Sequence, residues 1–418
     1  QPIPLPLLPA GLFTVVMLLM MTGLGLYQAH AEPFRVTIQR LVVAYGLSLM
    51  VMSLVFYLFP DTYVGRGVFA VTSVFAVTGV LAIRAMFFRV TDIGLPKRRV
   101  LVLGNGGEAE DTIRFLHETG HGRSIQYAGL YPVVADRDAP GETRFNHEHL
   151  LRTVRDLRVT EIVLAVRERR GGVLPLRQLL DCKLKGVRVM DLTSFYEREL
   201  GVLKVDNLRA SWLIFSHGFD QGLLRDVIKR SFDVVASLAL FILTLPILML
   251  AMLAILLESG RPIFYRQERV GQGGVPFMIL KLRTMVQDAE KDGQPRWAGQ
   301  NDARITPVGR FLRRTRIDEL PQLINVLRGD MSFVGPRPER PFFVRNLLED
   351  IPYYDVRHSV KPGVTGWSQV RYPYGASVED SLAKLQYDLY YVKNHSLFLD
   401  LLILIDTIQV VLLGKGAR

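Results

Sequence analysis

Cysteine is almost absent from this chain of 418 residues. Its one cysteine, Cys182, excludes a disulfide within the chain, and we expect a small buried side chain there rather than a catalytic thiol. Acidic residues are also scarce, with 40 against 51 lysines and arginines and a net charge of +11. This excess of positive charge favours phosphate or acidic-lipid ligands. Nucleic acid is the competing partner, but the long apolar runs argue against it.

A cleavable signal peptide is missing as well, since no early segment has a charged start and a small-residue cleavage site. Three apolar segments are present instead, at residues 7–27, 41–59 and 68–88. Each is close to the ~20 residues that cross a bilayer core. The hydrophobic fraction of 49% and mean hydropathy of +0.21 are high for a soluble enzyme. Residues 1–92 are therefore predicted to form transmembrane helices.

Basic residues predict the orientation of these helices. Arg35 and Arg40 lie between the first two segments, and a basic cluster follows the third from Arg89 onward. By the positive-inside rule, the first connection and everything after Arg89 are cytoplasmic. The visible chain, which begins at Gln1 without a methionine, then starts outside. We expect a missing first helix, which would complete a four-helix bundle.

A second region, residues 93–215, is predicted to be a Rossmann-like parallel α/β domain. A buried strand at residues 100–103 meets a turn containing Gly104, Gly106 and Gly107, and a helical pattern follows. Further apolar strands, EIVLAV and VRVMDL, alternate with helical stretches. Backbone N–H groups at such a turn can hold a phosphate.

The nucleotide fingerprint of this region is incomplete. Ala109 stands where the third glycine is usual, and no acid about twenty residues on suits a ribose. A Tyr-x-x-x-Lys proton relay, which a nucleotide-dependent oxidoreductase or dehydratase would use, is not recognisable. Cofactor binding, nucleotide-sugar or regulatory binding, a structural role and mediation of a homodimer all stay open.

The third region, residues 216–418, opens with an apolar element at residues 231–257 that contains Pro246. An ordinary kinked spanning helix is one interpretation. Basic residues flank both ends, however, which places both ends in the cytoplasm. Because proline removes a backbone hydrogen bond and bends a helix, we expect a re-entrant hairpin that enters and leaves the membrane on the same side.

The most informative stretch is residues 313–338, RRTRIDELPQLINVLRGDMSFVGPRP. Its arginines fit phosphate oxygens, because guanidinium groups donate paired hydrogen bonds. The adjacent acids Asp318 and Glu319 suit a divalent metal or a nucleophile beside phosphate. A structural alternative is a capping box formed by Thr315 and Asp318 at the start of the apolar helix.

These residues resemble the monotopic polyprenyl-phosphate glycosyl-1-phosphate transferases, a family of bacterial sugar transferases. Four further stretches agree in the family's order: KRSFDVVASLAL, FMILKLRTM, KPGVTGWSQV and YDLYYVKNHSLFLDL. The upstream half resembles the longer members, which carry membrane helices and a Rossmann-like domain. The resemblance implies a mainly helical, monotopic catalytic domain with a re-entrant helix. The family often has a serine before the proline of that helix, and this chain has Leu245.

The resemblance also implies a two-step reaction. Asp318 would attack the sugar-bearing phosphate of a UDP-sugar and release UMP, and undecaprenyl phosphate would then take the phosphosugar from the enzyme. Mg²⁺, held by Asp318 and Glu319, would offset the phosphate charge. The enzyme would act on the cytoplasmic face of the bacterial inner membrane, in the first membrane step of exopolysaccharide, capsule or O-antigen synthesis. The sugar itself cannot be read from the sequence.

Other roles follow by position in the family's motifs. Asp388 matches a functional acid, and Lys281, Arg313 and Arg337 match basic residues near the catalytic pair. For any one of them, the alternative is a surface ion pair.

The glycine-rich segment KPGVTGWSQVRYPYG contributes Arg371, which we expect to meet the diphosphate. Its aromatic residues Trp367, Tyr372 and Tyr374 could stack on uracil or anchor at the membrane interface. The last apolar helix carries Asp400 and Asp406, which fits a helix at the membrane surface better than one that spans it.

A different class of protein stays in view, a membrane-anchored regulator with an inactive transferase domain. The intact acid pair, GPRP turn and Asp388 argue against it.

Overall fold

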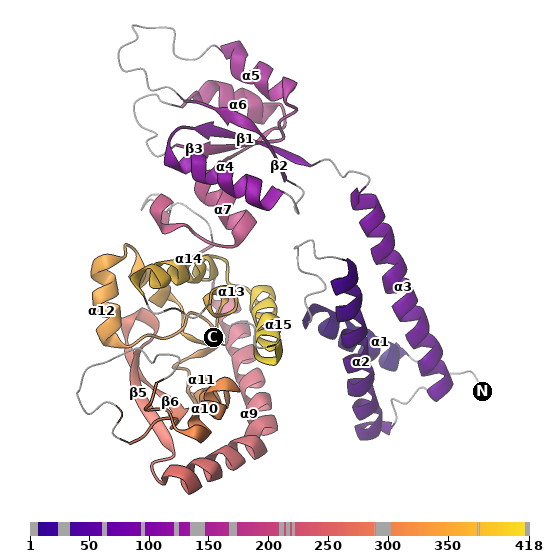
Figure 1. Ribbon diagram of the computed structural model, residues 1–418, viewed down its shortest axis with the longest axis vertical. Helices are drawn as coiled ribbons and strands as arrows, with labels where there is room; N and C mark the ends of the chain where they lie inside the picture. The colour runs from indigo at the N-terminus through magenta and orange to yellow at the C-terminus, as the bar shows by residue number, and fades with distance from the viewer. Residues whose placement is uncertain are drawn as a thin grey trace. The chain divides into compact units, whose positions relative to one another are not determined.

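The computed structural model describes residues 7–23, 34–60, 65–92, 97–120, 125–133, 147–166, 174–208, 213–214, 218–219, 222–287, 289, 302–373, 375 and 377–413. The chain packs as two units, Gln1–Phe195 and Tyr196–Arg418. The first unit contains apolar helices and an α/β sheet. The second contains further helices and two short sheets (Figure 1).

Three apolar helices form where the sequence predicts membrane segments: α1 (Leu7–Gly23), α2 (Phe34–Leu58) and α3 (Arg66–Asp92). Met17 and Met21 of α1 pack with Leu41 and Ala44 of α2. The apolar stretches of the three helices are shorter than a membrane span in the described residues. The helices are therefore confirmed, and their crossing of a bilayer stays a prediction.

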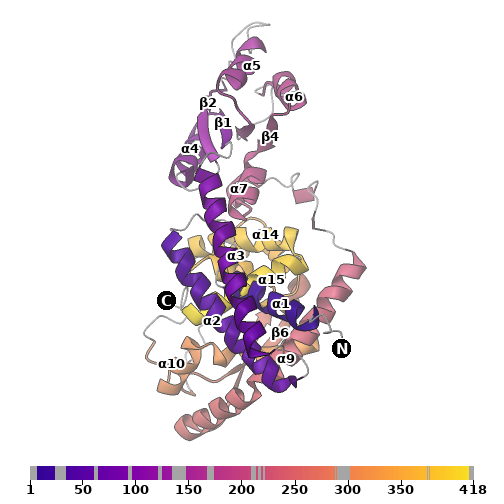
Figure 2. The same cartoon turned by 90° about the vertical axis from the view of Figure 1, so that its right-hand side faces the viewer.

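The sheet of the first unit is parallel throughout its described part, with strand order β2-β1-β3-β4. Its strands are β1 (Arg98–Gly104), β2 (Ile125–Tyr131), β3 (Glu161–Ala165) and β4 (Arg188–Asp191). Figure 2 shows α4 (Gly107–Gly120) on one face and α6 (Leu176–Leu184) on the other. Helix α5 (His147–Asp156) completes the described part, and the boundary between the two units falls within α7 (Leu192–Leu200). The predicted α/β fold is confirmed.

The glycine turn after β1 brings two backbone segments into contact. A Cβ atom on Gly104 would lie 2.0 Å from the carbonyl oxygen of Ala165, so only glycine fits there. Asn105 accepts a hydrogen bond from the backbone N–H of Val133 at 3.0 Å and so ties the turn to the end of β2. Ala109, at the position of the missing third glycine, is buried in α4.

Cys182 of α6 is fully buried in the apolar core of this domain, beside residues of β1 and β3. Burial raises the pKa of its thiol. A structural role for the single cysteine agrees with both observations.

The second unit begins with one long helix, α9 (Leu223–Ser259), which contains Pro246. Figure 1 shows α9 as two segments that run in different directions. Proline thus bends this helix without ending it, since the helix loses one hydrogen bond at that point. Among the described residues, the stretch from Arg225 to Ser259 is the one helix long and apolar enough to cross a membrane. Its bend is confirmed, and its re-entry into a bilayer is untested.

The rest of the second unit surrounds two short sheets. Strands β5 (Phe264–Val270) and β6 (Pro276–Leu282) form an antiparallel hairpin, and β7 (Ser332–Val334) pairs with β8 (Gly363–Thr365) in parallel. The helices are α10 (Pro307–Arg314), η4 (Ile317–Glu319), α11 (Gln322–Arg328), α12 (Pro341–Asp350), η5 (Tyr354–Ser359), α13 (Trp367–Arg371), α14 (Val378–Asn394) and α15 (Leu397–Leu413).

A segment at the start of the second unit packs into its core. Leu203, Val205 and Leu208 are buried beside Phe343 of α12 and Leu389 of α14. The backbone N–H of Leu203 donates to the carbonyl of Gln386 at 3.0 Å. Residues 196–208 therefore belong to the fold of this unit, although they precede its long apolar helix α9.

Candidate active site

The two candidate acids lie in η4, a 3₁₀ turn between α10 and α11. Arg316, at a left-handed φ of 60°, reverses the chain just before them. Thr315 donates its hydroxyl to the carbonyl of Phe311 at 2.9 Å and so closes the preceding helix. The capping box of Thr315 and Asp318 is therefore not formed, and that structural alternative is wrong.

Asp318 is buried, with 7% of its surface exposed. Its Oδ1 atom has no hydrogen-bond partner in the described part of the chain. Burial, with the charge of Glu319, raises the pKa of Asp318 to about 6, against the opposing charges of Lys281 and Arg313. At neutral pH the carboxylate is ionised but poorly solvated, which suits a nucleophile.

Glu319 sits among cations. Its Oε1 atom accepts hydrogen bonds from Lys281 Nζ at 2.9 Å and from Arg337 Nη2 at 3.3 Å, with Arg316 Nη1 at 4.0 Å. Burial opposes the ionisation of Glu319, but these charges outweigh it and hold its pKa well below the usual range. The structure thus brings together Lys281, Arg337 and both acids, as the sequence predicts.

Lys281 is aimed at η4 by a residue that the sequence analysis missed. Asn325 of α11 is fully buried; its Oδ1 accepts from the N–H of Leu280 at 3.0 Å, and its Nδ2 donates to the carbonyl of Met278 at 2.8 Å. This amide fastens α11 to β6 beside Lys281. An amide inside the otherwise apolar run LINVL is a signal that could have identified it.

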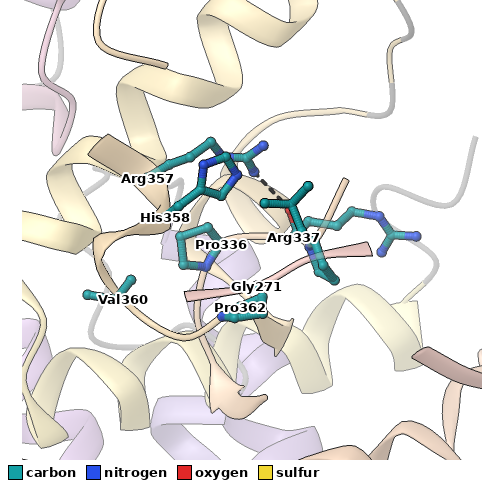
Figure 3. A pocket seen from close by; sticks show the side chains of 9 residues that line it. Gly271, Pro336, Arg337, Arg357, His358, Val360 and Pro362 are labelled. Atoms are coloured by element: carbon teal, nitrogen blue, oxygen red, sulfur yellow. Dashed lines mark hydrogen bonds between the residues drawn. The ribbon is translucent and has the colours of Figure 1, made fainter. Parts of the chain in front are cut away.

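Arg337 is held at both its backbone and its side chain. Its Nη1 donates to Gln369 Oε1 at 3.2 Å, and its carbonyl accepts from Arg357 Nη2 at 2.9 Å. Figure 3 shows the Arg357 guanidinium meeting the Arg337 backbone while the Arg337 side chain extends away from it. Prolines at 336 and 338 restrict the turn further.

Asp388 lies behind this turn rather than beside the acid pair. It is 1% exposed, and its Oδ2 accepts from Arg357 Nη2 at 2.7 Å. Arg357 also donates to the Tyr354 hydroxyl at 2.6 Å. The contacts place Asp388 where it orients Arg357, and thereby the backbone of Arg337. Arg357, buried and 31 residues from Asp388, was not identified from the sequence.

The other two predicted basic residues have different surroundings. Arg313 donates through Nε to Thr284 Oγ1 at 2.8 Å, and its charge lowers the pKa of Asp318. Arg371 pairs with Asp406 at 3.0 Å, and its guanidinium lies 4.4 Å from the Trp367 ring centroid. Arg313 is therefore part of the acid site, whereas the contacts of Arg371 tie α13 to α15.

Trp367 is not the exposed stacking surface that the sequence suggests. Its ring is 8% exposed, its Nε1 donates to the carbonyl of Gly201 at 2.8 Å, and it stacks on Tyr390 with centroids 5.9 Å apart. Tyr372 donates its hydroxyl to Asp380 at 2.9 Å. Tyr374 lies outside the described residues.

Two cavities in the described part of this unit are lined by residues other than the acid pair. One of about 10 Å³ lies between the GPRP turn and η5, lined by Arg337, Arg357 and His358, and has room for about one water (Figure 3). The other, of about 490 Å³, is lined by residues that include Asp206 and Tyr353. The chemistry of the acid site therefore identifies it better than cavity size does.

The carboxylate oxygens of the acid pair are of the ligand type that Mg²⁺ takes. No group of three metal-ligating side chains occurs in the described ranges. Mg²⁺ commonly takes one or two carboxylates and completes its shell with water and substrate phosphates. Asp318, with its buried unpartnered oxygen, and the adjacent Glu319 meet that requirement.

The second unit is similar to proteins of a known family. Residues 224–414 match the family model described as "Bacterial sugar transferase". Over 195 residues, 46% of this chain and 72% of the relative, the chain is 47% identical to a UDP-glucose:undecaprenyl-phosphate glucose-1-phosphate transferase of Caulobacter vibrioides. It is 40% identical to the uncharacterized sugar transferase EpsL of Bacillus subtilis over 196 residues, 46% of this chain and 91% of the relative.

A further relative, from Aeromonas hydrophila, is a UDP-N-acetylgalactosamine-undecaprenyl-phosphate N-acetylgalactosaminephosphotransferase. It is 40% identical over 242 residues, which are 58% of this chain and 56% of the relative. The chain thus spans little more than half the length of that relative. The names also differ in their sugar, so they do not assign one here.

Proposed function

Because this chain belongs to the bacterial sugar transferase family, the polyprenyl-phosphate glycosyl-1-phosphate transferases, we propose that it transfers a sugar 1-phosphate from a UDP-sugar to undecaprenyl phosphate and releases UMP. The observation that carries the proposal is the Asp318 carboxylate. It is buried, has an unpartnered oxygen and lies among the charges of Lys281, Arg313 and Arg316.

In the first step, an Asp318 oxygen attacks the β-phosphorus of the UDP-sugar. A bond forms between that oxygen and phosphorus, and the bond from phosphorus to the bridging oxygen breaks, so that UMP leaves with the electron pair. Asp318 then carries the sugar phosphate as an acyl phosphate. In the second step, a phosphate oxygen of undecaprenyl phosphate attacks the same phosphorus and frees the carboxylate. Neither step needs a proton if Asp318 starts ionised.

The cations around Glu319 support the first step. Attack by a carboxylate on an anionic diphosphate is unfavourable unless positive charge offsets the repulsion. Lys281 and Arg337 are held 2.9 Å and 3.3 Å from Glu319 Oε1, and both side chains carry donors that a phosphate can accept. The diphosphate takes over part of their hydrogen bonding from Glu319.

Mg²⁺ would be held by Asp318 and Glu319. When bound, it supplies positive charge that polarises the phosphates. The chain's own residues orient Arg337. Glu319 and Gln369 hold its side chain, and Arg357, held by Asp388, binds its backbone carbonyl.

We assign the reaction to the cytoplasmic face of the inner membrane, with α9 as a re-entrant helix. Along α9, many apolar side chains are more than half exposed, among them Val235, Ile242, Leu243, Leu250 and Leu257. Such an apolar surface fits lipid rather than water. Lys229, at the base of this helix, pairs with the buried Asp400 of α15 at 2.8 Å. This ion pair ties the membrane element to the unit that carries the acids.

The test is UMP release from a panel of UDP-sugars by the full chain, with undecaprenyl phosphate and Mg²⁺. We expect release with one sugar and a loss of at least about 1,000-fold in Asp318→Asn. Asp206→Asn, a matched change at an exposed acid, should keep wild-type activity. With the acceptor omitted and the β-phosphate labelled, wild type should retain protein-bound label and Asp318→Asn should not. Full activity in Asp318→Asn would overturn the proposed nucleophile.

A further inference from the structure

We propose that Gln369 positions Arg337 through its Oε1 atom and binds a phosphoryl oxygen of the sugar nucleotide through its Nε2 atom. The proposal rests on the proposed function, because it concerns the diphosphate that Arg337 binds. Gln369 lies in α13, on an element separate from the acid pair.

The orientation of the Gln369 amide follows from its partner. Arg337 Nη1 lies 3.2 Å from Gln369 Oε1. A guanidinium has donors only, so the atom that faces it must be the amide oxygen. The Nε2 group is then directed elsewhere, and it has two N–H donors.

Those donors lack an acceptor. The Nε2 atom is buried and has no hydrogen-bond partner in the described part of the chain. A buried amide donor without an acceptor destabilises the fold, so such groups normally find one. The fold keeps this amide close to the backbone of Gly366, where an added Cβ would lie 3.4 Å from Nε2.

The missing acceptor matches the ligand chemistry of the neighbouring guanidinium. Arg337 bridges Gln369 Oε1 and Glu319 Oε1 through Nη1 and Nη2. A phosphate that binds Arg337 therefore arrives beside the Gln369 amide, and its oxygens are acceptors without donors of their own. Asp318, the other acid of η4, has the complementary unpartnered group, a carboxylate oxygen. A phosphoryl group bound here would therefore accept a hydrogen bond from Gln369 Nε2 and face the Asp318 carboxylate, two groups that have no partner in the described part of the chain.

Two substitutions separate the two parts of this role. Gln369→Glu keeps an oxygen for Arg337 and replaces the amide donor by a second oxygen, which repels a phosphate. Gln369→Met keeps the side-chain length and removes both groups. Gln272→Glu is the matched control, because Gln272 is exposed and its Nε2 donates to the carbonyl of Ser359 at 3.0 Å.

The measurement is KM and kcat for the UDP-sugar, in the full chain in lipid nanodiscs, with thermal unfolding recorded for each variant. We expect Gln369→Glu to raise KM at least about tenfold with little change in unfolding temperature. Gln369→Met should raise KM and also lower kcat, because Arg337 loses a partner. Gln272→Glu should match wild type.

Wild-type KM and kcat in Gln369→Glu, with a defect in Gln369→Met, would overturn the phosphate contact and leave Gln369 as a support for Arg337. Wild-type values in both would overturn the positioning role too. If the wild-type chain releases no UMP from any donor, the proposed function fails. Calorimetric binding of inorganic pyrophosphate to the same variants then decides the Gln369 contact: equal affinity in wild type and Gln369→Glu overturns it.

Discussion

Asp318 combines two properties that normally oppose each other, burial and ionisation. Its raised pKa of about 6 means that the fold disfavours the negative charge that the proposed nucleophilic attack requires. The cations near Asp318 lower its pKa, but not enough to offset the effect of burial. Reactivity at this residue therefore comes at the expense of stability.

This conflict predicts the pH dependence of the reaction. Since the proposed attack by Asp318 needs the ionised carboxylate, kcat/KM should be level above about pH 7 and fall about tenfold per pH unit below about 6, near the pKa of Asp318. The measurement is initial UMP release from pH 5 to 8.5. A level profile down to pH 5 would contradict the raised pKa.

The same conflict predicts a stabilised variant. A carboxyl group with a folded-state pKa above its unfolded value destabilises the fold when it ionises. This effect shrinks as the pH falls below the folded-state pKa and is gone only below the unfolded-state pKa. Asp318→Asn should therefore be more stable than wild type at pH 8, by up to about 3 kcal/mol, and the difference should shrink at pH 5. Thermal unfolding at both pH values measures it. A less stable variant at pH 8 would show that the carboxylate is better satisfied than its contacts indicate.

At the residue scale, the sequence identified Asp318, Glu319, Lys281, Arg313 and Arg337, and the structure brings them together. Asp318 and Glu319 stand in an arginine-rich run, whereas Lys281, Arg313 and Arg337 were assigned through the family motifs that the sequence resembles. Arg357 and Asn325 were not identified from the sequence, because their roles depend on partners 20 to 47 residues away. Such pairings arise from tertiary packing and leave no periodic signal.

At the scale of the elements, the GPRP turn is fixed by a buried ion pair between η5 and α14. Removing one partner of a buried pair leaves the other charge uncompensated, which costs about 3–5 kcal/mol. We therefore expect Asp388→Asn to lower both the unfolding temperature and kcat.

The matched comparison is the double variant Arg357→Met with Asp388→Leu. It should recover stability because neither charge is left unpaired, but it should not recover kcat, because the Arg337 carbonyl loses its donor. Thermal unfolding and UMP release separate the two effects. Near-wild-type turnover in Asp388→Asn would exclude a role for Asp388 in holding the turn.

Helix α9 gives a second prediction at this scale. If α9 re-enters the membrane, a cysteine at Leu245 should resist membrane-impermeant maleimide from the periplasmic side, in a Cys182→Ser background. Phe59→Cys, between α2 and α3, is the periplasmic control, and Gln272→Cys is the cytoplasmic one. Labelling of Leu245→Cys from the periplasm would show a spanning helix.

Element prediction succeeded where one local signal dominated. The apolar runs gave α1, α2 and α3, and the alternation of buried strands with helices gave the parallel sheet. The bend of α9 was predicted from Pro246, and the re-entry of this helix into a bilayer stays a prediction. Whether a proline bends or divides a helix depends on what packs around it, which the sequence does not state.

At the scale of the whole molecule, the second unit includes residues that precede its long apolar helix α9. Leu203, Val205 and Leu208 are each buried in its core, and such side chains contribute roughly 1.5–3 kcal/mol each. A chain of residues 196–418 should therefore unfold at a clearly higher temperature than one of residues 216–418. Both can be compared in the same detergent. Equal unfolding temperatures would show that the segment adds nothing to the fold.

The ion pairs of Glu319 have a consequence for exchange at the site. Because Lys281 and Arg337 already hold a carboxylate, an incoming diphosphate trades places with an internal anion instead of entering an empty, strongly positive pocket. The net gain in binding free energy is small when a phosphate replaces Glu319 as the partner of these cations, and this holds for any phosphate. Glu319 thus acts as a resident competitor that limits how tightly any phosphate is retained. In the proposed reaction, where UMP leaves before a lipid phosphate enters at the same place, such a limit is an advantage.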